Sequence, residues 1–350
     1  MKIIKSVFII LFILQINIES FSQIGGNNTY EFLNLTNSSR VAALGGNFLS
    51  IYDDDITLAP NNPSLINPGM HNQLALSFVD YYEKINYGFV SYSRTSPRLG
   101  SYVATLQFID YGTFKLADNT GVVNGEFTAN EMAFNLGWGR SLDSSFTIGA
   151  NIKAIYSSFE SYNSFGLAVD VAGTYHSTDK SFSASVIFKN IGTQLASYYS
   201  GGSGPLPFEI QLGISKRLQH VPFRYSILFT HLEKWDLTYA EPGSNAFNTF
   251  EDDNNEKKGI ADFGDKLFRH IVLGGELYIG KNFTLRVGYN YKRRQEMKVD
   301  TKVSTVGFSW GFGIRISKFH FSFSRSTYHL VGSPNYITIT SNLSELFSKR

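Results

Sequence analysis

Three short patterns in this sequence contain the residue types of known catalytic serines. Gly307-Phe308-Ser309-Trp310-Gly311 matches G-x-S-x-G, in which the serine of many hydrolases lies on a sharp turn between a strand and a helix. Ser177-Thr178-Asp179-Lys180 matches S-x-x-K, and Ser161-Tyr162-Asn163 matches S-x-N, as in penicillin-binding proteins. The chemistry would be acyl transfer through a serine nucleophile, so the elements that position these serines decide whether it is possible.

The predicted elements place neither Ser309 nor Ser177 for catalysis. Ser309 falls in the middle of a strand whose alternation continues on both sides, so the sharp turn is missing. Ser177 falls in a hairpin turn rather than at the start of a helix, and no Lys-Thr-Gly accompanies it. The sequence has no cysteine, no histidine pair at zinc-ligand spacing and no G-x-x-x-x-G-K-[ST]. We therefore expect no enzymatic activity and no cofactor.

Alternating apolar and polar residues dominate the chain between residues 74 and 340, in about fourteen segments. In the clearest segment the apolar positions are Val306, Phe308, Trp310, Phe312, Ile314 and Ile316. Alternation with a period of two indicates strands with one apolar face and one polar face. The polar faces are rich in Gly, Ser, Ala and Asn, as in a narrow enclosed lumen. A soluble sandwich, the alternative, would present a polar face rich in Lys, Glu and Thr.

The charged residues of these strands lie on the polar faces. They are Lys153, Asp170, Lys189, Glu209, Glu276, Arg286 and Arg315. An Arg or Lys on the lipid face at the bilayer midplane costs about 2–4 kcal/mol, so this placement is typical of strands whose apolar faces contact lipid. Closure into a barrel lets every backbone N–H and C=O pair inside the bilayer. We therefore predict an all-β fold, a transmembrane outer-membrane β-barrel of about 14 antiparallel strands.

The connections between the predicted strands alternate in length. The short ones are residues 95–99, 141–145, 177–180, 218–221, 280–282 and 317–318. The longer ones are residues 112–126, 190–206, 232–268, 292–302 and 327–334, with exceptions at the tight turn 82–83 and at 157–163. Outer-membrane barrels have short periplasmic turns and longer extracellular loops, so we expect the long set to be exposed at the cell surface.

Residues 1–22 have the pattern of a secretory signal peptide. Lys2 and Lys5 precede an apolar run from Val7 to Ile16, and Ser20-Phe21-Ser22 provides a cleavage region. The run has about 10 residues where a spanning helix needs roughly 20, so a membrane anchor is the weaker alternative. The net charge of +2 over 350 residues gives no indication of nucleic-acid binding.

Residues 23–73 do not alternate, and we expect them to form an N-terminal plug inside a barrel domain of residues 74–350. Gly45-Gly46 suits close packing, and Asn62-Pro63-Ser64 predicts a short helix capped by Asn62. Arg40 and the run Asp53, Asp54, Asp55 are candidates to pair with the lumen charges. The alternatives for the run are a solvated turn and a calcium loop, although the spacing and the downstream glutamate of a calcium loop are absent.

Several stretches, in their order along the chain, resemble the PorV/PorQ family of outer-membrane barrels, and the PorQ branch most of all. The family belongs to the type IX secretion system and is distantly similar to the FadL fatty-acid transporters. The main stretches are Phe32-Leu33-Asn34-Leu35, Ala43-Leu44-Gly45-Gly46, Asn62-Pro63-Ser64-Leu65, Phe188-Lys189-Asn190-Ile191-Gly192, Lys234-Trp235-Asp236-Leu237-Thr238, Asp265-Lys266-Leu267-Phe268-Arg269-His270 and Gly288-Tyr289-Asn290-Tyr291. Each is short, so their order and spacing carry the resemblance.

The resemblance implies a fourteen-stranded barrel with an N-terminal plug and a role without enzymatic activity. That role is to anchor a PorZ-like protein at the cell surface, within an attachment complex that includes a PorU-like sortase and a PorV-like barrel. The complex would remove the C-terminal signal of secreted cargo and join the cargo to anionic lipopolysaccharide. The expected partners are these proteins and outer-membrane lipid.

The longest predicted loop, residues 232–268, is the candidate partner-binding surface. Its aromatic residues are Trp235, Tyr239, Phe247, Phe250, Phe263 and Phe268. Long loops are usually functional or disordered, and aromatic residues among polar ones are typical of protein interfaces. The alternatives are a disordered loop and a loop folded into the lumen. A second function also remains open, because a FadL-like transporter of hydrophobic small molecules would use the same aromatic loops around an apolar pocket.

Overall fold

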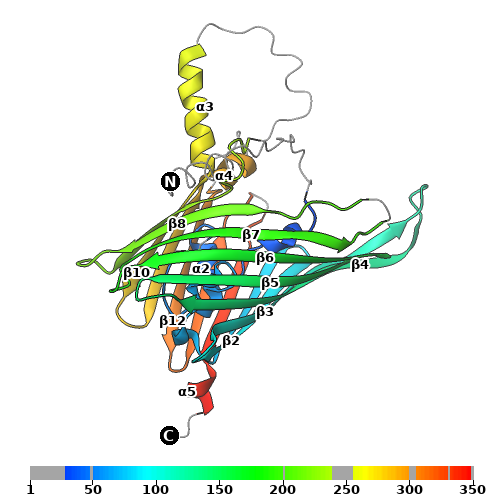
Figure 1. Ribbon diagram of the computed structural model, residues 1–350. Helices are drawn as coiled ribbons and strands as arrows, with labels where there is room; N and C mark the ends of the chain where they lie inside the picture. Colours follow the sequence, from blue (N-terminus) through cyan, green and yellow to red (C-terminus); the bar gives the residue numbers. More distant parts are fainter. Residues whose placement is uncertain are drawn as a thin grey trace, which may run out of the picture.

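The computed structural model describes residues 28–47, 50–199, 202–238, 255–298, 305–329 and 332–347. Fourteen antiparallel strands, each paired with its neighbours in sequence, close into a single barrel when β1 pairs with β14 (Figure 1). The prediction of an all-β barrel of about fourteen strands is therefore confirmed.

The strands of the barrel differ greatly in length. Their bounds are β1 Gln73–Tyr82, β2 Ile85–Ser96, β3 Gly100–Ala117, β4 Val123–Ser141, β5 Phe146–Phe159, β6 Tyr162–His176, β7 Phe182–Ala196, β8 Glu209–Arg217, β9 Phe223–Phe229, β10 Ile271–Ile279, β11 Phe283–Asn290, β12 Phe308–Ile316, β13 Phe319–Ser326 and β14 Asn335–Asn342. The longest pair is β3 and β4, whose hairpin reaches beyond the other strands (Figure 1).

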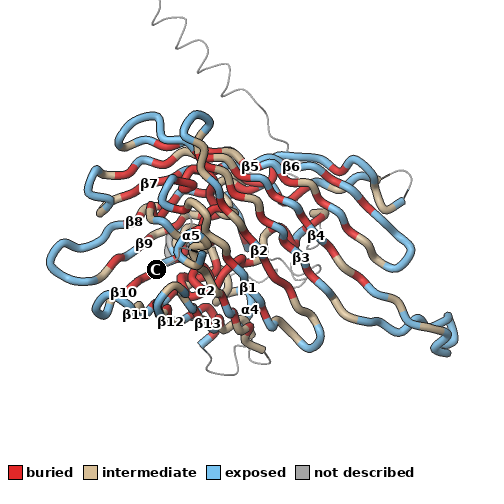
Figure 2. The backbone as a smooth tube through the Cα atoms, turned by 90° about the horizontal axis from the view of Figure 1, so that it is seen from below, coloured by how far each residue is buried: buried red, intermediate tan, exposed pale blue. Residues whose placement is uncertain are grey.

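The polarity of the barrel is inverted relative to that of a soluble domain. Phe308 is 54% exposed, whereas its strand neighbour Ser309 is 2% exposed and faces the interior. Buried and exposed residues alternate in this way along the strands (Figure 2). An exposed face of large apolar side chains is stable only where the surrounding solvent is lipid, so the wall has the surface of an outer-membrane barrel.

Several segments predicted as loops belong to strands, because backbone pairing continues beyond the point where the alternation of the sequence ends. Residues 112–126 form the ends of β3 and β4, which are joined by a turn that begins at Asp118. Residues 157–163 belong mostly to β5 and β6, and β7 runs on to Ala196. In an extended hairpin each strand satisfies the hydrogen bonds of the other, so pairing does not require an apolar face.

Two other predicted loops contain helices. Helix α3, Asn255–Arg269, lies within residues 232–268, and α4, Tyr291–Met297, replaces the irregular start of residues 292–302. Both lie at the same end of the barrel, and the short α5, Leu343–Phe347, lies at the opposite end (Figure 1). In the part of the chain that the structure describes, no helix is long and apolar enough to cross a bilayer.

Residues 28–47 and 50–72, here called the N-terminal segment, run through the inside of the barrel (Figure 1). Its helices are η1 Glu31–Asn34, α2 Ser39–Ala43, η2 Ile56–Leu58, η3 Pro63–Leu65 and η4 Pro68–Met70. The segment touches nearly opposite sides of the wall. A Cβ at Gly149 of β5 would collide with the Pro63 backbone, and one at Gly288 of β11 would collide with Leu44 and Gly45. Glycine at these wall positions lets the two backbones approach closely.

Candidate functional site

The interior of the barrel has a charged zone near the short turns, organised by one buried arginine. Ser38 caps α2 by accepting the Val41 N–H, and this places Arg40 in the first turn facing β10. The Arg40 guanidinium bonds Asp53 at 2.8 Å, Asp55 at 2.9 Å and Glu276 at 2.9 Å. We call Arg40, Asp53, Asp55, Glu276 and Arg286 the Arg40 cluster.

Glu276 joins the N-terminal segment to the barrel wall. Its carboxylate accepts from Arg40 and from Arg286, each at 2.9 Å, and from the Tyr278 hydroxyl at 2.9 Å. The side chain is only 1% exposed, so both guanidinium groups are needed to compensate the cost of burying it. Within the segment, burial acts to raise the pKa of Asp55. The charge and hydrogen bonds of Arg40 outweigh that effect, and the pKa lies below its ordinary value.

A polar cavity of about 490 Å³ adjoins the Arg40 cluster at the end of the barrel where the short turns lie. Its lining includes Asp54, Lys281, Arg315, Lys318 and His320. Arg315, predicted as a lumen charge, is exposed here at the mouth, whereas the other six predicted lumen charges are buried. Charged walls of this kind favour water and ions over apolar molecules.

A second ionic network lies further along the wall. Lys153 bonds Asp170 at 2.8 Å and Asn190 at 2.7 Å, and Asp170 accepts the backbone N–H of Asn190 at 2.8 Å. The β6–β7 register shifts at this point, because Asn190 has a left-handed backbone conformation with φ of 56°. Lys189, beside it, lies opposite Glu209 on β8. These buried charges therefore stabilise the bulge at which the β6–β7 register shifts.

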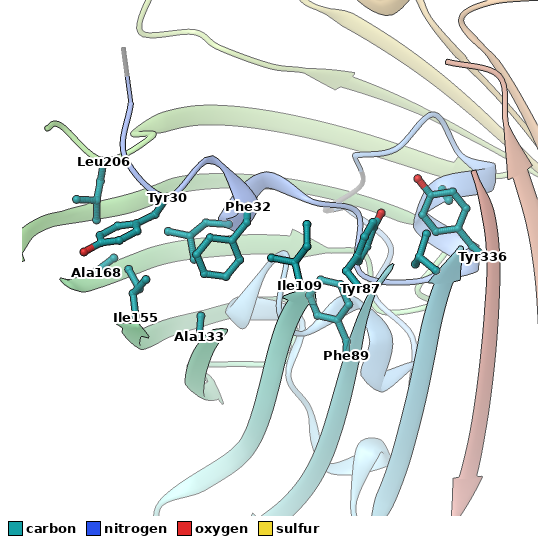
Figure 3. Packing of buried hydrophobic residues seen from close by; sticks show 13 residues of the cluster. Tyr30, Phe32, Tyr87, Phe89, Ile109, Ala133, Ile155, Ala168, Leu206 and Tyr336 are labelled. Carbon is teal, nitrogen blue, oxygen red and sulfur yellow. The ribbon is translucent and has the colours of Figure 1, made fainter. Parts of the chain in front are cut away.

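The interior near the long loops contains an apolar cluster, which we call the aromatic belt. It consists of Tyr30, Phe32, Leu33, Ala42, Val79, Tyr87, Phe89, Ile109, Ala133, Ile155, Ala168, Leu206 and Tyr336 (Figure 3). Tyr87 lies edge-on to Phe89 at 6.2 Å and to Tyr336 at 6.5 Å between ring centres. Tyr30 and Phe32 come from the N-terminal segment, and the other rings come from the wall, so the segment fills the space that the wall residues enclose.

A few hydrogen bonds hold the start of the N-terminal segment in the belt. The Thr29 N–H donates to the Pro205 carbonyl at 2.8 Å, and Gln107 Nε2 donates to the Phe32 carbonyl at 2.5 Å. The Tyr30 hydroxyl bonds the Ser164 hydroxyl. Burial raises the pKa of Tyr30, so the ring remains neutral at physiological pH. No ion pair of the described residues 28–35 reaches the wall.

The predicted partner-binding loop is partly described. Trp235 is 50% exposed and packs against Phe263 of α3 at 5.3 Å and against His270 at 5.7 Å. Phe268 is exposed and packs against Tyr291 of α4. Tyr239, Phe247 and Phe250 lie outside the described residues, as does the predicted signal peptide. The structure therefore brings the three described aromatic residues to the two helices at the long-loop end.

The serine patterns form no catalytic arrangement in the structure. Ser309 faces the interior from β12, and its hydroxyl accepts from Arg293 at 3.4 Å. Ser177 lies in the β6–β7 turn, where its hydroxyl donates to Asp179 at 2.5 Å. Among the residues the structure describes, no three His, Asp or Glu side chains group as metal ligands.

The aromatic belt was not predicted from the sequence, although β2 contains a signal of it. The inward face of β2 begins with Tyr87 and Phe89 and continues with Ser91 and Ser93. The inward face is therefore apolar at one end of the strand and polar at the other. An apolar inward face indicates that something apolar lies inside the barrel.

The closed barrel with a chain segment inside has the fold of two solved outer-membrane transporters. The toluene transporter TbuX of Ralstonia pickettii has a TM-score of 0.52 and 12% identity, covering 88% of this chain and 99% of that chain. The toluene transporter TodX of Pseudomonas putida has a TM-score of 0.51 and 12% identity, with the same coverage. A FadL homologue from Pseudomonas aeruginosa has a TM-score of 0.48 and 9% identity, covering 88% of this chain and 98% of that chain.

Sequence comparison adds nothing to this assignment, because no protein-family model and no curated protein matches the chain. At 12% identity the structural likeness shows the fold alone. It gives no support to the resemblance to the PorV/PorQ family, so that resemblance stays a prediction.

Proposed function

We propose that the protein is an outer-membrane channel for small hydrophobic molecules, with the aromatic belt as their binding site. The observation that carries the proposal is the cluster of buried aromatic rings inside the barrel near the long loops. Ligand sites are typically apolar and aromatic with a few polar groups. The toluene transporters TbuX and TodX, which share the fold, agree with this substrate class.

The N-terminal segment would act as the plug of this channel. Tyr30 and Phe32 occupy the belt, so a ligand must displace them to enter. The start of the segment is held there by packing and hydrogen bonds, whereas Arg40 is held by three carboxylates. A movement that leaves Arg40 in place and withdraws Tyr30 and Phe32 is therefore the least costly way to open the belt.

Uptake of 1-N-phenylnaphthylamine tests the proposal. This apolar aromatic probe fluoresces after it has crossed a lipopolysaccharide outer membrane into lipid. Expression of the barrel in a host that excludes the probe should give saturable uptake. Phe32→Ala should increase the uptake rate, because it removes a ring from the belt. Phe134→Ala, which removes a ring from the lipid face, is the matched control and should leave the rate unchanged. Uptake equal to that of cells without the barrel, for wild type and Phe32→Ala alike, contradicts the proposal.

The exposed aromatic residues beside α3 support a second candidate, the anchoring of a cell-surface protein. Trp235, Phe263 and Phe268 are each at least half exposed at the long-loop end. Exposed Trp and Phe among charged residues are typical of interface hot spots. On this reading the partner is PorZ-like, the attachment complex contains a PorU-like sortase and a PorV-like barrel, and the long loops face the cell exterior.

A pull-down of tagged protein from native outer membranes in mild detergent tests this second candidate. A large surface protein in stoichiometric amount, lost when residues 240–265 are deleted, would support anchoring. Deletion of the turn residues 119–121 is the control, because that turn lies on another loop. A barrel that is reproducibly free of protein partners but carries bound lipid would contradict anchoring and favour the channel.

A further inference from the structure

A depression in the outer, lipid-facing side of the wall crosses strands β5 to β8 near the short turns. These four strands are neighbours in the barrel (Figure 1). The depression has a volume of about 580 Å³, and we call it the lipid-face groove. The large side chains that line it from the outward face are apolar or aromatic. They are Phe146, Ile148, Tyr175, Val186, Leu212 and Ile214.

Two small residues form the floor of the groove. Gly173 on β6 lies between Ile148 on β5 and Val186 on β7, and Ala184 on β7 lies opposite Tyr175. A Cβ at Gly173 would meet no atom within 4 Å, so the space above this residue is open. The larger side chains on both sides therefore enclose a low centre in an otherwise bulky lipid face.

The shape of the groove matters because it is surrounded by lipid. Apolar character alone gives little affinity in a bilayer, since lipid tails are as apolar as the side chains. A groove adds van der Waals contact, because a chain lying in it touches protein atoms on the floor and on both sides. At the usual strand spacing, four strands extend over about 14 Å, so the groove suits one extended acyl chain.

Aromatic rings lie at the end of the groove beside the short turns. Tyr175 packs against Phe146 at 5.0 Å and against Phe182 at 6.3 Å between ring centres. Each of the three residues lies at the end of its strand or one position from it. Aromatic residues of barrels mark the boundary between hydrocarbon and headgroups. A lipid whose chain occupies the groove therefore has its headgroup beside these rings.

The charge beside these rings is positive. Lys216 is exposed on the outward face of β8, directly opposite Phe182. Two further cations are close in the chain fold, because Arg217 donates its backbone N–H to the turn that contains Lys180. The carboxylate of that turn, Asp179, is engaged by two serine hydroxyls of the same turn. This end of the groove is therefore complementary to an anionic headgroup.

We propose that the lipid-face groove binds one anionic phospholipid, with an acyl chain over Gly173 and Ala184 and the phosphate beside Lys216. Outer-membrane barrels have their short turns on the periplasmic side, so the lipid belongs to the periplasmic leaflet. The groove lies on the outside of the wall, whereas the aromatic belt lies inside it. The bound lipid is therefore a resident of the wall, whether or not the barrel is a channel.

Native mass spectrometry of the purified full-length barrel, released from detergent micelles, measures lipid retention. The probes are dioleoyl phosphatidylglycerol, which is anionic, and dioleoyl phosphatidylethanolamine, which has no net charge, at equal concentrations. Wild type should retain one phosphatidylglycerol about fivefold more strongly, which is the contribution of one lysine beside an anionic lipid. Lys216→Gln should abolish this preference. Arg94→Gln, which removes an exposed cation of β2 outside the groove, is the matched control and should keep it.

Gly173→Leu tests the groove itself. The open space above Gly173 accepts a side chain, so the variant should fold, and the leucine takes the place of the acyl chain. Retention of both phospholipids should fall about fivefold, which corresponds to roughly ten lost van der Waals contacts. Ala154→Leu, on the lipid face of β5 outside the groove, is the matched control and should retain both lipids as wild type does.

Four outcomes would overturn the phospholipid site. Equal retention of the two lipids by wild type would contradict recognition of the headgroup. Retention by Gly173→Leu at the wild-type level would show that the chain does not lie in the groove. An equal loss in Ala154→Leu would indicate an unspecific lipid annulus. A wild-type dimer that Gly173→Leu dissociates would show that a second copy of the chain occupies the groove.

Discussion

Two parts of the same internal segment are held in the barrel by different forces. At Arg40, three carboxylates bond one buried guanidinium, and Glu276 ties it to the wall. At Tyr30 and Phe32, rings pack against wall rings with a few neutral hydrogen bonds. Ion pairs in a buried site depend on every partner being present, whereas apolar packing tolerates exchange of one apolar group for another.

The difference indicates how the segment can be both fixed and displaceable. A small aromatic molecule can replace the Phe32 ring in the belt with little loss of apolar contact. Nothing of comparable chemistry can replace Arg40 between Asp53, Asp55 and Glu276 without leaving charge unpaired. The Arg40 cluster is therefore the fixed point, and residues 28–35 are the part that a hydrophobic ligand can displace.

The largest effect is expected from Arg40→Met, which removes the fixed point. Glu276 would keep only Arg286, and Asp53 and Asp55 would lose their guanidinium, so unfolding in urea should become easier by about 3–5 kcal/mol. Tryptophan fluorescence of the detergent-folded barrel measures the change. Arg98→Met, at an exposed turn, is the control and should shift the free energy by less than about 0.5 kcal/mol. Equal shifts for the two variants would show that the cluster does not hold the segment.

A smaller effect is expected from Asp55→Asn, and it should depend on pH. The folded-state pKa of Asp55 lies below the ordinary value of 3.8, so its ionised form stabilises the fold above that value. That contribution is lost as the pH falls through the lower folded-state pKa. Asp55→Asn should therefore cost about 1.5–3 kcal/mol at pH 7 and progressively less below pH 3.8.

Urea unfolding at several pH values between 7 and 2 measures how the difference in stability between Asp55→Asn and wild type decreases. Asp80→Asn, an exposed carboxylate on β1, is the control and should give a curve parallel to that of wild type. A cost of Asp55→Asn that stays constant down to the lowest pH would mean that the carboxylate is not stabilised by its charge.

The barrel could be predicted from the sequence because its signal is local. Phe308 and Ser309 differ in polarity and face opposite sides, and the same rule holds along most strands, so strand number and facing follow from alternation. Residues 112–126 were wrongly predicted as a loop because the polar and apolar faces of the β3–β4 hairpin exchange sides after Asp110. A reader of the sequence sees the alternation break there, although the backbone pairing continues.

The two interior zones could not be predicted in the same way. Arg40 and Glu276 are 236 residues apart, and nothing local to either residue identifies the other as its partner. Glu276 falls on the polar face of its strand in the sequence, and this predicts only that its side chain faces the lumen. The aromatic belt joins Tyr30 to strands β1 to β6 and to β14, so its existence depends on the path of the segment through the closed barrel.

The smallest effect is expected from Tyr30→Phe, and it tests whether the start of the segment and the region around Arg40 move independently. The change removes one hydrogen bond to Ser164, which keeps the Ala196 carbonyl and Gln194 as partners, so global stability should fall by only about 0.5–1.5 kcal/mol. Amide hydrogen exchange should accelerate in residues 29–35 and stay unchanged in residues 38–46 around Arg40. Tyr156→Phe, which removes a hydroxyl on the lipid face, should change neither region. If exchange instead accelerates equally in both regions, the segment opens as one unit, and the Arg40 cluster cannot serve as the fixed point of a moving plug.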